Sequence, residues 1–116
     1  MTINSIDLIG RLGGDPTVRY FESGSVLVEF SLAINRPNAN KETDWFSCIA
    51  WGKTAELIAN HCKKGGQIAV EGRLEQDEWT SKEGLQRIKI KVVVDRITFI
   101  KGGEKKEEAE SEEPSF

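Results

Sequence analysis

The sequence predicts an all-β fold, a five-stranded barrel with one short helix between the third and fourth strands, followed by an acidic tail. Between residues 3 and 100, apolar side chains recur mostly at every second position, and only one stretch has helical spacing. Eleven glycines are available for tight corners. A chain of 116 residues is near the commonest size of one domain. We therefore expect one domain over residues 1–103 and a tail over residues 104–116.

A strong turn signal separates the first two expected strands. The first covers residues 3–12, where Leu8, Gly10 and Leu12 share one side and Ile9 interrupts the alternation. Gly13-Gly14-Asp15-Pro16 then favours a turn. The second strand covers residues 26–34, where all even-numbered residues are apolar and positions 29 and 31 are polar. Such a strand has one buried face and one solvent face.

The third strand is expected over residues 45–51, where large and small side chains alternate and positions 45, 47, 49 and 51 share one face. The helix follows it, because apolar residues stand at positions 55, 58, 59 and 62. Lys63-Lys64-Gly65-Gly66 then supplies cations for the helix C-terminus and a glycine to end the helix.

Apolar alternation over residues 68–74 and 88–94 predicts the fourth and fifth strands. The polar segment Thr80–Gly84 lies between them and indicates the tip of a long hairpin. The apolar phase slips after position 94, which indicates a β-bulge near Asp95-Arg96. This order of strands and helix is that of the oligonucleotide-binding barrel, which is favoured over an open sandwich with a helix packed on one sheet.

Composition and motifs exclude several classes. No apolar run is long enough to span a membrane, and no export or import signal is visible, so we expect a cytoplasmic location. Cys48 and Cys62 fit neither a disulfide scaffold nor a CxxC motif, and His61 is the single histidine. No Ser-His-Asp set or phosphate-binding glycine loop is present in the sequence. We therefore expect a protein that is not an enzyme and that needs no metal or cofactor.

Three tryptophans are candidates for a binding surface. Trp45 and Trp51 share a face of one strand, about 20 Å apart at about 3.3 Å per residue. Trp79 stands beside polar residues on the hairpin, where a core residue would be out of place. The alternative for all three is that they are buried or half-buried packing residues, and for Trp45 and Trp51 the two interpretations are evenly balanced. Basic residues accompany them on the predicted barrel: Lys53, Lys63, Lys64, Arg87, Lys89 and Lys91. Rings interleaved with cations are typical of single-stranded nucleic-acid binding, because bases stack on rings and phosphates need positive charge.

Several longer stretches resemble the bacterial single-stranded DNA-binding protein family. They are Asn4–Pro16 with Val18–Tyr20, Phe30–Ala33, Trp45–Glu56, Lys64-Gly65 with Val70–Leu74, and Trp79-Thr80 ahead of Gly84. The resemblance covers roughly residues 3–100. It implies an oligonucleotide-binding fold, a homotetramer, and coating of single-stranded DNA without base specificity in replication, recombination and repair.

The resemblance also implies roles for individual residues. Trp45, Trp51 and Trp79 fall on stacking positions. Basic positions that meet phosphates correspond to Arg19, Lys53, Lys63, Lys64 and Arg87, and the charge pattern adds Lys89 and Lys91. Two departures are visible: Asn38 stands where the family has another stacking aromatic, and Asp77-Glu78 stands where the family often has bases.

The net negative charge of the chain lies in the tail. Residues 104–116 carry six acids and two lysines, a net charge of −4, whereas residues 1–103 carry +1. With almost no apolar content this tail is expected to be disordered. The family tail commonly ends in acids followed by Pro-Phe, and this one ends Glu112-Glu113-Pro114-Ser115-Phe116. The resemblance implies that replication and repair proteins bind Glu112, Glu113, Pro114 and Phe116.

Two other functions remain alternatives on the same fold. One is a primosomal or RNA-binding barrel, and three tryptophans on the predicted surface disfavour the aromatic-poor primosomal version. A nuclease would need clustered acids and a metal ion. A nucleoid-associated location in the cytoplasm follows from the DNA-binding prediction.

Overall fold

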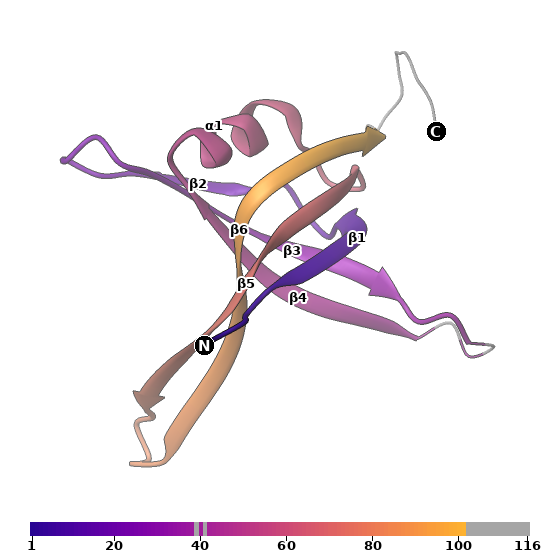
Figure 1. Ribbon diagram of the computed structural model, residues 1–116. Helices are drawn as coiled ribbons and strands as arrows, with labels where there is room; N and C mark the ends of the chain where they lie inside the picture. Colours follow the sequence, from indigo (N-terminus) through magenta and orange to yellow (C-terminus); the bar gives the residue numbers. More distant parts are fainter. Residues whose placement is uncertain (39, 41, 102–116) are drawn as a thin grey trace.

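The computed structural model describes residues 1–38, 40 and 42–101. Within this part of the chain, six strands and one helix follow one another (Figure 1): β1 Ile6–Leu12, β2 Thr17–Tyr20, β3 Val26–Asn35, β4 Thr43–Trp51, α1 Gly52–His61, β5 Gln67–Thr80 and β6 Gln86–Lys101. No helix in the described ranges is long and apolar enough to cross a membrane. The described residues end before the expected domain boundary at residue 103, so this boundary stays a prediction.

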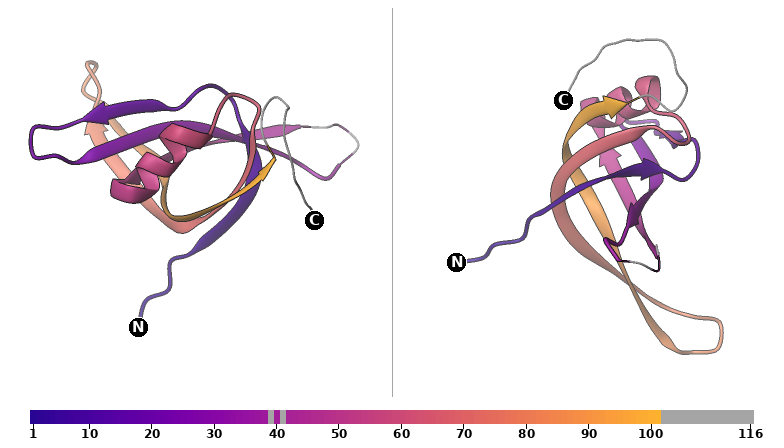
Figure 2. Two further views of the ribbon diagram at one scale, coloured as in Figure 1. Left: turned by 90° about the horizontal axis from the view of Figure 1, so that it is seen from above. Right: turned by 90° about the vertical axis from the view of Figure 1, so that its right-hand side faces the viewer.

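The strands form one sheet that closes on itself, as the two further views show (Figure 2). The order is β1-β5-β6-β4-β3-β2, and an additional pairing of β1 with β3 closes the ring. β4 and β6 run parallel, and the other pairs are antiparallel. The closure confirms the predicted barrel and excludes the open sandwich, because a sandwich would leave two separate sheets.

The structure has one strand more than the sequence predicts. β2 has only four residues and forms a hairpin with β3, from Thr17 opposite Glu29 to Tyr20 opposite Val26. Four residues are too few for periodicity to indicate a strand. The first strand is also shorter than predicted, since it begins at Ile6 rather than at residue 3.

The expected end of the helix is wrong in its detail. The helix ends at His61, and Cys62 follows in an extended conformation while its N–H donates to the Ile58 carbonyl. Gly65, with φ of 84°, lies in the next turn, which the hydrogen bond from the Gly66 N–H to the Lys63 carbonyl closes. The left-handed glycine therefore belongs to the connection to β5 and does not end the helix.

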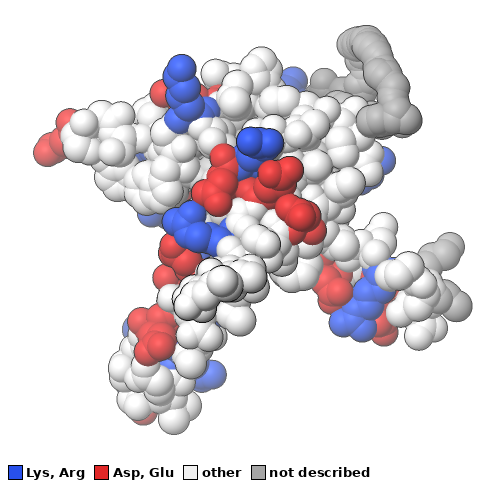
Figure 3. All heavy atoms as spheres, in the orientation of Figure 1, with Lys and Arg blue, Asp and Glu red and all other residues white. Residues whose placement is uncertain are grey.

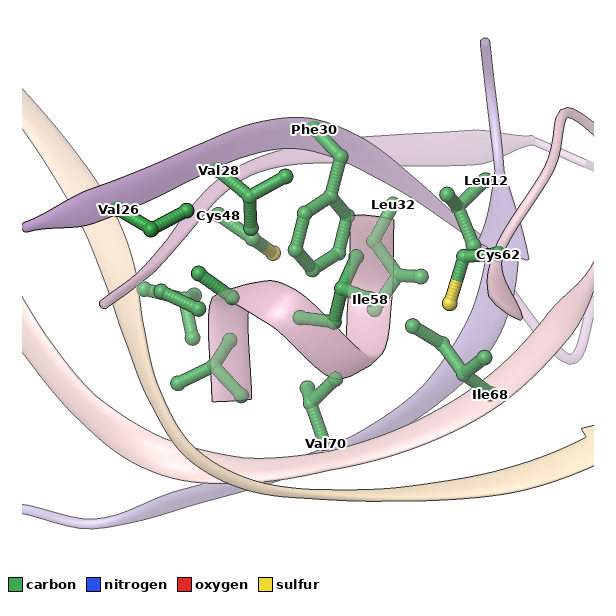
Figure 4. Packing of buried hydrophobic residues seen from close by; sticks show 14 residues of the cluster. Leu12, Val26, Val28, Phe30, Leu32, Cys48, Ile58, Cys62, Ile68 and Val70 are labelled. Carbon is green, nitrogen blue, oxygen red and sulfur yellow. The ribbon is translucent and has the colours of Figure 1, made fainter. Parts of the chain in front are cut away.

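The core fills the inside of the ring, and α1 covers one end of it (Figures 1 and 4). Ala55 and Ile58 point from the helix into the barrel and are fully buried. The even-numbered apolar side chains of β3 meet them from the opposite wall. The complete cluster consists of Leu12, Val26, Val28, Phe30, Leu32, Cys48, Ala50, Ala55, Ile58, Cys62, Ile68, Val70, Val92 and Val94.

A β-bulge bends the longest strand pair where the sequence predicts it. Glu71 lies opposite Arg96 and Gly72 lies opposite Val94, so Asp95 is the extra residue of β6. At this bend Gly72 approaches β6 so closely that a Cβ atom would overlap the Val93 carbonyl. The glycine is therefore required by the close approach of two backbones, and the bend allows β5 and β6 to change from barrel wall to a projecting hairpin.

The β5–β6 hairpin projects well beyond the barrel (Figure 1). Its turn is closed by hydrogen bonds between Ser81 and Leu85 and from the Gly84 N–H to the Ser81 carbonyl, which confirms the predicted hairpin tip. Because the core ends below it, two apolar side chains on its inner face, Ile88 and Ile90, are more than half exposed.

Candidate nucleic-acid interface

Pairing register places Trp45 and Trp51 on the outer face of the sheet. On β4 the core-facing residues are Cys48 and Ala50, which are buried, so the odd-numbered residues from 45 to 51 face outward. Trp45 is 62% exposed and Trp51 is 48% exposed. These exposures exclude burial of the two rings in the core, and half-buried packing stays the alternative to a binding role.

The other arm of this face is formed by β6 and β5. Val93 of β6 pairs with outward-facing Ile49 of β4, and alternation then places Arg87, Lys89 and Lys91 on the same outer face. Trp79 pairs directly with Arg87 across the β5–β6 hairpin and is 48% exposed. The sheet thus brings three exposed tryptophans and three basic residues from distant parts of the sequence to one surface, which we call the tryptophan face.

Arg19 lies at the opposite border of the tryptophan face. It pairs with Leu27 of β3, whose other neighbour is Trp51 of β4. Cross-strand partners point to the same side of a sheet, so Arg19 faces outward on the same side as Trp51, with β3 between them. Lys53 is close in sequence to the same ring, in the first turn of α1, and is exposed.

Lys63 and Lys64 are not on the tryptophan face. They follow the far end of α1 and line an open pocket of about 550 Å³ together with Asp15, Pro16 and the end of the helix. The Asp15 carboxylate accepts a hydrogen bond from the Lys64 backbone N–H at 2.9 Å. A ten-residue helix of about 15 Å therefore separates these two lysines from Trp51, and only a strand that bends around the helix would reach both.

Sequence reasoning missed one aromatic ring of the interface. Phe21, in the turn after β2, stacks on Trp51 with ring centroids 5.8 Å apart and an interplanar angle of 29°. Phe21 is 44% exposed, and Tyr20 beside it is exposed as well. The available signal was an aromatic pair next to the turn at Gly24, which has φ of 95°. The stacked pair extends the aromatic surface around Trp51.

Ion pairs reduce the free positive charge of the tryptophan face. The Lys91 ammonium lies 3.1 Å from the Asp77 carboxylate, and the Arg19 guanidinium lies 3.1 Å from the Glu29 carboxylate. In the described part of the chain, Lys53, Arg87 and Lys89 have no carboxylate within ion-pair distance. On the side of the molecule drawn in Figure 3, basic and acidic groups are likewise intermixed. The rings, more than the cations, distinguish this surface.

A charged cluster closes the β3–β4 hairpin at the other end of the face. Arg36 donates two hydrogen bonds of 3.0 Å to the Asp44 carboxylate and one of 2.7 Å to Glu42. The hydrogen bonds from Arg36 lower the pKa of Asp44 below its ordinary value. Both carboxylates occupy the guanidinium, so Arg36 is not a free cation for a phosphate near Trp45. Asn38, the departure from the family pattern, is exposed in the same hairpin.

The structure assigns the cysteines to the core. Both thiols are free and buried, and burial raises the pKa of Cys48 to about 12 and that of Cys62 to about 11. Among the described residues, no three His, Cys, Asp or Glu side chains are grouped so that they could hold a metal ion. The predicted partner-binding residues of the tail, Glu112, Glu113, Pro114 and Phe116, lie outside the described residues.

Comparisons with known proteins agree with the geometry. The family model described as the single-strand binding protein family matches residues 3–100. A single-stranded DNA-binding protein of Thermosynechococcus vestitus is 42% identical over 101 residues, which are 86% of this chain and 84% of that protein. Single-stranded DNA-binding protein 1 of Synechocystis sp. is 43% identical over 114 residues, covering 96% of this chain and 93% of that protein. A single-stranded DNA-binding protein of Aquifex aeolicus is 40% identical over 121 residues, covering 97% and 82%.

Proposed function

This chain belongs to the single-strand binding protein family, and we propose that it binds single-stranded DNA without base specificity on the tryptophan face. Its activity is binding rather than catalysis, as in the rest of that family. It coats and protects strands exposed in replication, recombination and repair. The observation that carries the proposal is the gathering of three exposed tryptophans on one sheet face.

Each residue has a physical role in this proposal. Trp45, Trp51 and Trp79 offer flat rings on which any base can stack, which gives affinity without reading the sequence. Lys53, Arg87 and Lys89 supply unpaired charge for phosphates, and Arg19 and Lys91 do so after exchanging their carboxylate partners. Lys63 and Lys64 extend the path to a strand that passes the end of α1.

Titration with a dT oligonucleotide tests this function. We expect the intrinsic tryptophan fluorescence to be quenched on binding, and mixed-sequence single strands to compete nearly as well as dT. The three unpaired cations at the face should by themselves make log K fall with log salt with a slope of about −2 per protomer, at about −0.7 per phosphate, and Arg19 and Lys91 should make the slope steeper. Preference for duplex DNA would contradict the proposal. Stronger binding of rU than of dT would support the RNA-binding alternative, and cleavage of labelled strands in magnesium or calcium would support a nuclease.

We propose a homotetramer as the active form. One edge of β1 pairs with β5 along its length. The opposite edge pairs with β3 only at Arg11 and Leu12, so in the described structure no strand pairs with this edge from Ile6 to Gly10. Ile9 on this strand is 58% exposed, and Ile88 and Ile90 are exposed on the projecting hairpin. Unpaired edges and exposed apolar residues of this kind are covered in assemblies.

Sedimentation equilibrium of the full chain at micromolar concentration measures the assembly. The expected mass is about four times the 13.0 kDa of one chain. Ile9→Asp should reduce the mass, because it places a charge in the contact, and Leu57→Asp, the same charge at an exposed position of α1, should not. A monomer mass for the unchanged chain would contradict the proposal.

We further propose that the tail recruits partners. Its support is compositional: Glu112 and Glu113 precede Pro114 and an aromatic Phe116, and a partner pocket with an apolar hole beside Arg or Lys would accept such a segment. Replication and repair proteins are the expected partners. The cytoplasmic, nucleoid-associated location also stays a prediction that follows from the proposed DNA binding.

A further inference from the structure

We propose that Gly13 is a positioning residue for Trp45. The absent side chain of Gly13 leaves the space in which the indole ring lies, and the ring thereby takes the orientation in which it meets a base. The inference rests on the proposed function, because it assumes that a base stacks on Trp45. Neither the family match nor the names of the relatives assigns a role to this glycine.

The contact is specific to the ring. A Cβ atom built on Gly13 would overlap Cζ3 of Trp45 and would lie 3.2 Å from Cη2 and 3.4 Å from Cε3. All three atoms belong to the six-membered part of the indole. Gly13 does not have a left-handed backbone, since the positive φ angles among the described glycines occur at positions 24, 52, 65 and 84. The ring, and not the backbone conformation, is therefore what requires a glycine at position 13.

The backbone around Gly13 is fixed, so an added methyl group would move the ring. The Gly13 N–H donates to the Ser31 carbonyl of β3 at 3.0 Å. The preceding residue, Leu12, is held by Gly65 and Gly66 through hydrogen bonds of 2.8 and 3.0 Å. Trp45, in contrast, is 62% exposed and has free space on its solvent side. Displacing the ring therefore costs little folding free energy. It weakens binding instead, because the ring no longer has the orientation for stacking before DNA binds.

Gly14 is a matched control beside Gly13. It also lacks a positive φ, and a Cβ atom there would meet nothing within 4 Å. Any general effect of stiffening the turn with an alanine is shared by the two positions. A difference between Gly13→Ala and Gly14→Ala therefore reports the contact with Trp45.

The test is a cycle of four full-length chains titrated with a dT oligonucleotide: unchanged, Gly13→Ala, Trp45→Ala and the double variant. We expect Gly13→Ala to weaken binding about three- to thirtyfold, no more than Trp45→Ala does, because a displaced ring loses at most one stacked base. Gly14→Ala should bind as the unchanged chain does. The double variant should bind as Trp45→Ala alone, a non-additivity that a merely structural role of Gly13 would not produce.

A second readout needs no DNA. With Trp51 and Trp79 replaced by phenylalanine, Trp45 is the sole tryptophan. Adding Gly13→Ala should shift its emission toward that of a fully solvated indole, and adding Gly14→Ala should leave the emission unchanged. If Trp45→Ala binds more weakly but Gly13→Ala changes neither binding nor emission, the inference about Gly13 is wrong and the proposed DNA-binding function stands. Unaltered binding of Trp45→Ala would overturn the stacking role of Trp45, and the inference would fail with it.

Discussion

Replacing Trp45, Trp51 and Trp79 together by alanine is expected to weaken binding of a dT oligonucleotide at least about a hundredfold. One base stacked on an aromatic ring contributes about 1–3 kcal/mol, so three lost stacks remove about 3 kcal/mol or more. The remaining affinity should be electrostatic and should disappear as salt is raised. Because this variant has no tryptophan left, the anisotropy of a labelled oligonucleotide is the appropriate measurement.

The matched control is the variant with phenylalanine at the same three positions. It keeps a ring at every site and should lose much less affinity than the alanine variant. All three tryptophans are about half exposed or more, so both variants should fold, as their melting temperatures and circular dichroism would show. If the alanine variant melts normally and binds with unchanged affinity, the tryptophan face is not the DNA-binding site.

The single replacements should not be equal. Trp51 stacks on Phe21 at 5.8 Å, whereas Trp79 stands on a projecting hairpin opposite Arg87. Removal of Trp51 therefore also leaves Phe21 without its neighbour, and Phe21→Ala should reproduce a part of that loss. This inequality arises from tertiary contacts between turn and strand, and the spacing of tryptophans in the sequence does not contain it.

Periodicity was sufficient to predict the barrel because each long strand has one buried face. The even-numbered residues of β3 illustrate this, since the same pattern that predicts the strand also supplies the core wall. The bulge at Asp95 was predictable for a related reason: an extra residue changes the phase of the apolar pattern on its two sides. The short strand β2 was not predicted, because four residues with one half-buried side chain have no measurable period.

The tryptophan face could be predicted only in part. Residues 45 and 51 share a face by alternation within one strand, which a sequence shows directly. That Trp79 and Lys89 join the same face depends on the parallel pairing of Ile49 with Val93, a long-range contact without a local signal. The ion pairs of Arg19 and Lys91, and the contact of Gly13 with Trp45, likewise depend on strand neighbours that the fold alone brings together.

Ile58→Ala is expected to reduce the free energy of unfolding by about 2–5 kcal/mol, because a fully buried side chain leaves a cavity among rigid barrel walls. Its neighbour on α1 provides the control: Leu57 is 44% exposed, and Leu57→Ala should change stability by less than about 0.5 kcal/mol. Urea unfolding followed by circular dichroism measures both. α1 covers the end of the barrel and carries Lys53 two residues after Trp51. The Ile58 variant should therefore bind DNA normally at urea concentrations well below its unfolding midpoint and lose affinity near that midpoint. Equal effects of the two replacements would show that α1 is not a wall of the core.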